Sequence, residues 1–196
     1  MGRSRTQQVE RTLGMATRFL EDVRSDIGRA AQDGGDIAPR IRSVHERPGH
    51  ATPEFRTLAI PLPDGMGESP PEVLAGSIAH YAERKRPDCL LLAMEAEMAD
   101  GGGERRTLLI AEARDRAGTR MYWMQPFRPG AGAVDWEEPL EGGWRDPGEA
   151  EMILDAAFAG RDVPPDPPRA RRRRRAAPAE TEREVALPGL SVGQAD

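Results

Sequence analysis

Three glutamates in the middle of the chain, Glu95, Glu97 and Glu112, are the residues whose type and spacing best suit chemistry. Carboxylate oxygens that converge bind hard divalent cations, and paired carboxylates also serve as general acid and base. Glu95 and Glu97 stand two residues apart in the apolar run PDCLLLAMEAEMA, residues 87–99. Because side chains alternate along a strand, these two would share one face of a sheet. The role of the carboxylates therefore depends on the strands that hold them.

Those strands are expected to form an antiparallel meander over residues 89–98, 105–115 and 119–127. In the first hairpin we predict that Ala99 faces Glu104, which places Glu97 opposite Arg106. This register gathers the apolar side chains on one face and leaves the three glutamates on a face open to water. A shift by one residue would bury charged side chains. The glutamates are then interpreted as fixing the register, and a metal or acid–base site is the alternative.

The second hairpin has the turn sequence DRAGT, residues 115–119. Gly118 suits the left-handed position of a three-residue hairpin loop. A turn closed in this way sets Trp123 opposite Ala111, so that a large side chain meets a small one.

The order helix–strand–strand–strand–helix resembles the core of restriction-type nucleases, whose motif is an acidic residue followed by (Asp/Glu)-x-Lys on the next strand. The corresponding tripeptide here is EAR, residues 112–114, and arginine cannot give up its proton to act as a base. The single lysine, Lys85, falls on the preceding helix. We therefore expect no catalytic site, no cofactor and no metal, and an enzyme acting on a small substrate is the third functional hypothesis.

The first 33 residues predict one amphipathic helix, which begins at the capping-box pair Ser4 and Gln7. Its apolar residues alternate by four and three positions, as in a coiled-coil seam: Val9, Leu13, Ala16, Leu20, Val23 and Ile27. Such a seam binds a partner helix or a second copy of the chain, or it packs on the chain's own sheet. The pattern leaves both interpretations open.

The remaining elements predict an α+β fold. Residues 34–53 read as a connector, 54–160 as the folded domain and 161–196 as a disordered tail. The domain is expected to hold a small, mostly antiparallel sheet of three or four strands. Two capped helices should cover one face, the first from Pro70 to Pro87 and the second from Asp146 to Gly160.

A long loop, residues 128–148, precedes the last predicted helix. Loops of this length are often functional. Trp136 and Trp144 within it are candidates for a ligand site, and the alternative is that they close the core.

The tail carries six arginines within seven positions: Arg169, Arg171, Arg172, Arg173, Arg174 and Arg175. Such a run attracts phosphates without reading sequence. It also precedes the apolar segment VALPGLSVG, residues 185–193, which could dock on another protein as a peptide.

The totals suit a protein of the reducing cytoplasm. The 196-residue chain has a formal net charge of −5, contains one cysteine, Cys89, and shows no apolar run long enough to span a membrane. We expect a cytoplasmic, bacterial, non-catalytic interaction or assembly component that contacts a protein partner or itself through the helix seam and the tail. The alternative is a nucleic-acid-associated protein that binds weakly through the tail arginines.

Overall fold

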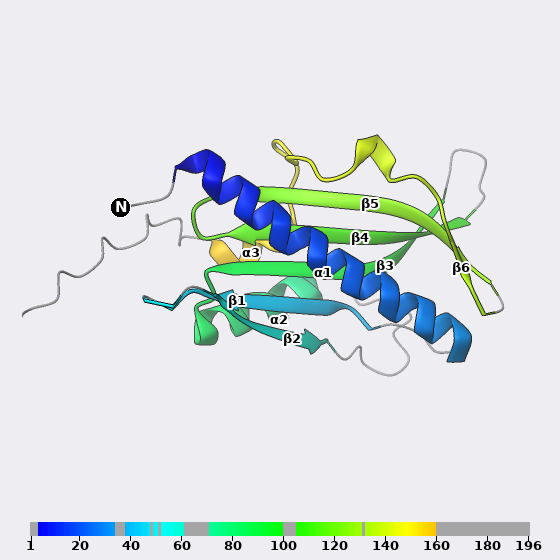
Figure 1. Cartoon of the computed structure of the whole chain (residues 1–196), viewed down its shortest axis with the longest axis horizontal. Helices are drawn as coiled ribbons and strands as arrows, with labels where there is room; N and C mark the ends of the chain where they lie inside the picture. Colours follow the sequence, from blue (N-terminus) through cyan, green and yellow to red (C-terminus); the bar gives the residue numbers. More distant parts are fainter. Residues whose placement is uncertain are drawn as a thin grey trace, which may run out of the picture. The chain divides into compact units, whose positions relative to one another are not determined.

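The structure is a computed structural model that describes residues 4–33, 38–47, 49–50, 52–60, 71–99, 105–130 and 132–159. Figure 1 shows its elements: α1 (Arg5–Asp33), β1 (Arg40–His45), β2 (Glu54–Ala59), α2 (Pro71–Lys85), β3 (Cys89–Ala99), β4 (Arg105–Asp115), β5 (Arg120–Pro129), β6 (Val134–Trp136), the 3-10 turn η1 (Leu140–Gly142) and α3 (Asp155–Phe158). In this described part, none of the helices combines the length and apolar character needed to cross a membrane.

The strands form one six-stranded sheet in the order β2-β1-β3-β4-β5-β6. All neighbouring pairs are antiparallel. The structure thus confirms a mixed α+β fold with an antiparallel sheet, but the sheet is larger than the three or four strands expected. The additional strands are β1, which lies within residues 34–53, and β6, which lies within the long loop. In β1, RIRSVH, arginines alternate with apolar residues, so its apolar signal was weak.

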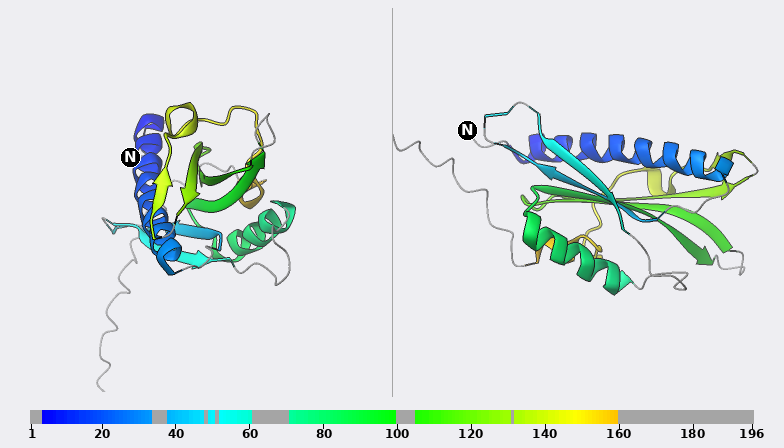
Figure 2. Two further views of the ribbon diagram at one scale, coloured as in Figure 1. Left: turned by 90° about the vertical axis from the view of Figure 1, so that its right-hand side faces the viewer. Right: turned by 90° about the horizontal axis from the view of Figure 1, so that it is seen from below.

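Helices cover both faces of the sheet (Figure 2). α1 packs on one face and shares a core with apolar residues of the central strands, among them Leu91, Ala93, Leu109 and Ala111. α2 and α3 pack on the other face, in a second core that includes Leu90 and Leu92. The run LLLA of β3 is therefore buried on both sides. We name the two sides of the sheet the α1 face and the α2 face.

This double burial explains why the predicted register of the first hairpin was wrong. Ala99 faces Arg105, not Glu104, and Glu97 faces Thr107, not Arg106. The one-residue shift places Glu112 opposite Leu92, on the α2 face. An apolar strand that is buried on both faces sets no preference between the two registers, so the alternation argument did not apply to it.

The second hairpin agrees with the prediction. Ala111 faces Trp123, and the Asp115 N–H donates to the Thr119 carbonyl at 3.1 Å. Gly118 has a φ of 92°, the left-handed conformation that the turn requires. The residues of the turn were therefore sufficient to predict the register of this hairpin.

The ends of the helices agree only in part. The capping box of α1 forms, because the Gln7 N–H donates to Ser4 Oγ at 3.3 Å and the Ser4 N–H donates to Gln7 Oε1 at 3.1 Å. The predicted helix from Asp146 to Gly160 is reduced to the four residues of α3. Asp146 instead accepts the N–H of Gly148, whose φ is 62°, and so closes a turn.

Candidate functional site

The three glutamates of the sequence analysis do not converge. Glu95 and Glu97 point to the α1 face, whereas Glu112 points to the α2 face, because opposed residues of neighbouring strands share a face. Glu97 forms an exposed ion pair with Arg105 at 3.2 Å. Among the described residues, no group of three histidine, cysteine, aspartate or glutamate side chains could hold a metal ion.

Glu112 is buried, with 7% of its surface exposed. Its carboxylate accepts the backbone N–H groups of Ile153 at 3.1 Å and Leu154 at 2.9 Å. Burial raises the pKa of Glu112, and Asp155 adds to this effect, while the two backbone bonds and Arg120 oppose it. The expectation that this glutamate faces water was therefore wrong: it anchors the segment that leads into α3.

Asp155 completes this polar cluster. It pairs with Arg114 at 3.2 Å and with Arg120 at 2.6 Å. Arg120 also donates to the carbonyl of Gly148 at 2.7 Å, and Arg114 lies over the Phe158 ring at 5.5 Å. These charges hold the segment around α3 against β4 and β5, so the cluster is explained by structural bonds.

Other buried or half-buried ionisable groups also have structural partners. Asp115 accepts hydrogen bonds from Thr12 Oγ1 at 2.9 Å and Gln8 Nε2 at 3.2 Å, which join α1 to the sheet. Asp88 accepts the N–H of Glu46 at 2.7 Å. Burial raises the pKa of the Cys89 thiol, which disfavours the nucleophilic thiolate.

The helix seam faces the chain's own sheet. Ala16, Leu20, Val23 and Ile27 are buried in the core on the α1 face. Val9 packs partly against that core, and Leu13 is 36% exposed. The sheet thus occupies the surface that the sequence had left open to a partner helix.

The two candidate ligand-loop tryptophans also pack on this core. Trp144 meets Trp123 with 5.7 Å between ring centroids, and Trp136 meets Phe127 at 4.9 Å. Gly143 approaches Trp123 so closely that an added Cβ would lie 3.1 Å from the ring. The two tryptophans thus cover the core on the α1 face beside β5. The tail arginines, Arg169 and 171–175, lie outside the described residues.

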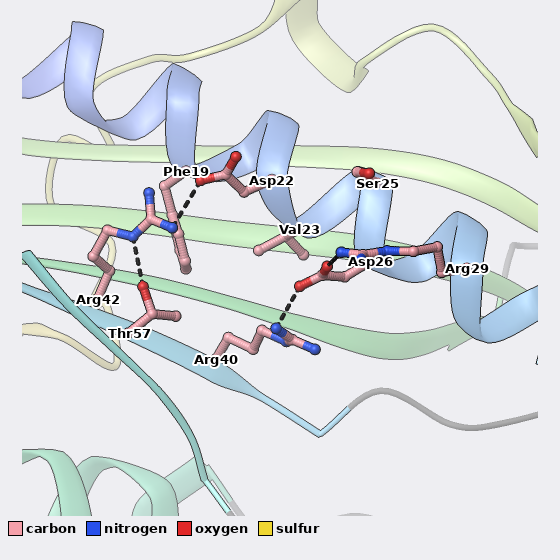
Figure 3. A pocket seen from close by; sticks show the side chains of 9 residues that line it. All are labelled: Phe19, Asp22, Val23, Ser25, Asp26, Arg29, Arg40, Arg42 and Thr57. Atoms are coloured by element: carbon pink, nitrogen blue, oxygen red, sulfur yellow. Dashed lines mark hydrogen bonds and ion pairs between the residues drawn. The ribbon is translucent and has the colours of Figure 1, made fainter.

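Two adjoining grooves lie between α1 and the strands β1 and β2. The first has a volume of about 290 Å³ and the second about 590 Å³, and Asp22 and Arg42 line both. Phe19 and Val23 also line the first groove (Figure 3). Phe55 of β2 and Met15 of α1 belong to the second.

The charges of the first groove bind one another. Arg42 donates to Asp22 at 2.8 Å and to Thr57 Oγ1 at 2.8 Å, and it lies 4.9 Å above the Phe19 ring. Asp26 pairs with both Arg29 and Arg40, as Figure 3 shows. Each of these charged side chains thus has a partner of opposite charge within the groove, where three arginines face two aspartates.

The remaining candidate surface beside these grooves is the edge strand β2. All six of its residues are exposed, including Phe55 at 50% and Leu58 at 38%. β2 forms one edge of the sheet, because it lies outside β1 in the strand order. Sequence reasoning predicted a strand here but missed its role. The signal was available: EFRTLA mixes charged and apolar residues as an edge strand does.

Any functional conclusion rests on the contacts and exposed surfaces described above, because comparison with known proteins gives no match. No family model matches the chain, and no curated protein and no solved structure shows significant similarity to it.

Proposed function

We propose that the protein is a non-catalytic interaction or assembly component that contacts its partner through β2, with the tail as a second contact. The observation that carries the proposal is the exposure of all six β2 residues at the edge of the sheet. An edge strand presents unpaired N–H and C=O groups, which another chain can complete by adding a strand.

The chemistry of the buried groups supports a role without catalysis. Glu112 and Asp115 are bound by backbone or side-chain donors that connect elements of the fold. A catalytic acid or base needs access to a substrate proton. The burial of Cys89 and the engagement of these carboxylates favour a binding function in the reducing cytoplasm.

The proposal is tested with a photoreactive phenylalanine analogue placed at Phe55 or at Val73. Both side chains are 50% exposed, but Val73 lies on α2 and not on β2. Each protein is irradiated in an extract of the cells that produce it. We expect a covalent protein adduct from position 55 and none from position 73. Equal labelling at both positions, or none at either, would contradict the proposal.

A second candidate function rests on the charge pattern of the tail. Arg169 and the five arginines at 171–175 form a compact cationic run. Such a run supports weak, sequence-independent binding to nucleic acid. Its test is given in the Discussion.

A further inference from the structure

We propose that β2 pairs with β2 of a second copy of this chain, antiparallel about a two-fold axis at Phe55, so that two six-stranded sheets become one. This inference rests on the proposed function, because it names the partner of the same edge.

The two edges of the sheet differ in their suitability for pairing. β6 has three residues, whereas β2 has six and contains no proline. Short strands and prolines protect natural edges from pairing. β2 is therefore the edge that can accept another strand.

The free backbone groups of β2 follow from its bonds to β1. The Ile60 N–H donates to the Pro39 carbonyl at 2.7 Å. Bonded and non-bonded pairs alternate along an antiparallel ladder, so the backbone groups of Phe55, Thr57 and Ala59 point away from β1. With the axis at Phe55, the two copies of Phe55 exchange hydrogen bonds, and the Thr57 N–H faces the carbonyl of the second copy's Pro53. Ala59 lies beyond this paired segment.

Charge complementarity identifies a second copy as this strand. With the axis at Phe55, Glu54 faces the second copy's Arg56, and Arg56 faces the second copy's Glu54. An axis at Glu54 or at Arg56 would instead bring two like charges together. A two-fold axis normal to the sheet lies midway between the two copies of one residue. Facing side chains lie on the same face of the sheet, so each residue faces one that is an even number of positions away.

The side chains have the freedom that this pairing needs. Arg56 is exposed, and no ion pair involving it occurs in the part of the chain that the structure describes. Glu54 pairs with Arg47 at 2.5 Å, and both side chains are exposed. Its carboxylate has two oxygens, so it can accept a second arginine.

The axis also brings two exposed rings together. Phe55 lies on the α1 face, where it lines the groove of about 590 Å³ beside Met15. The second copy's Phe55 would stand directly opposite at this groove. Pairing would thus cover an aromatic side chain that is half exposed in the single chain.

The mass of the full chain in solution gives the first test. We expect light scattering to show a species of twice 21.5 kDa at high protein concentration. Arg56→Glu and Glu54→Arg each set like charges face to face, so each variant alone should be monomeric. An equal mixture should form a heterodimer, because the facing charges are then opposite. Arg105→Glu, an equal charge change on β4, should remain dimeric.

Cysteine pairing tests the position of the axis. Phe55→Cys should form a disulfide between copies under mild oxidation, whereas Thr57→Cys and Leu58→Cys, displaced along the strand, should not. The wild type, whose Cys89 is buried, is the oxidation control. Circular dichroism should show that all variants are folded.

A wild type that is monomeric at every concentration would overturn the inference, as would folded charge variants that remain dimeric alone or fail to mix. Cross-linking at position 57 in place of 55 would overturn the axis. A monomeric wild type that still forms the Phe55 adduct in cell extract would reject self-pairing and retain the proposed function. If the wild type is monomeric and no adduct forms at Phe55, both self-pairing and the proposed function are rejected.

Discussion

The carboxylate of Glu112 accepts the backbone N–H of Leu154 at 2.9 Å, although 42 residues separate them. The bond crosses from β4 to the segment that begins α3, and the neighbouring N–H of Ile153 binds the other carboxylate oxygen. The Glu112 side chain therefore anchors the segment that leads into α3 on the α2 face. The first two predictions follow from this contact.

Glu112→Gln should lower the free energy of unfolding by about 1–3 kcal/mol, because an amide keeps one acceptor and turns its NH2 group towards the other N–H. Urea unfolding measures this change. Glu97→Gln is the matched control. Its ion pair with Arg105 is exposed, and the change there should stay within about 0.5 kcal/mol. Equal effects of the two variants would contradict the anchoring role.

The contribution of Glu112 should also depend on pH. Burial raises its pKa above the ordinary value of 4.5, so the folded chain keeps a proton that the unfolded chain has lost. The free energy of unfolding then falls as the pH rises from 4.5 through the folded-state pKa. We expect the stability advantage of the wild type over Glu112→Gln to shrink across that window. A growing advantage would be inconsistent with a raised pKa; Asp88, whose pKa is also raised by burial, is common to both proteins.

Substitutions in the helix seam should act on folding. Leu20 is buried under the sheet, so Leu20→Ala should lower the free energy of unfolding by about 2–5 kcal/mol. Leu13→Ala, at the exposed edge of the same seam, should cost much less. Thermal and urea unfolding provide the measurements. If Leu20→Ala kept full stability and changed the oligomeric state instead, the seam would be a surface for partners.

The tail arginines should control any binding to nucleic acid. If Arg169 and residues 171–175 neutralise six phosphates, the logarithm of the binding constant should fall with the logarithm of salt concentration with a slope of about −4 to −5. Fluorescence anisotropy with labelled duplex DNA measures this slope. Deletion of residues 169–175 should abolish the binding, and an unchanged affinity would eliminate the second candidate function.

Local signals in the sequence were sufficient where a few neighbouring residues determine the structure. The turn at Gly118 set the register of β4 and β5, and Ser4 with Gln7 set the start of α1. The helix expected from Pro70 to Pro87 forms as α2, Pro71–Lys85.

Prediction was wrong where contacts between distant parts of the chain determine the strand register or the strand order. The register of β3 and β4 depends on the cover that α3 gives to Glu112, and nothing near that glutamate in the sequence indicates it. The edge position of β2 follows from the insertion of β1 beside β3, and β1 has a weak pattern of its own. The candidate site was therefore missed together with the strand order.

The docking of α1 on the sheet has a consequence for synthesis. The helix is made before the strands, and Phe127, one of the side chains in the core beneath it, is made more than ninety residues after the helix ends. During this interval the apolar side of the nascent helix has no sheet to rest on, and exposed surface of this kind recruits chaperones or aggregates. Removing residues 1–33 would uncover the same sheet permanently, so a truncated chain should be insoluble.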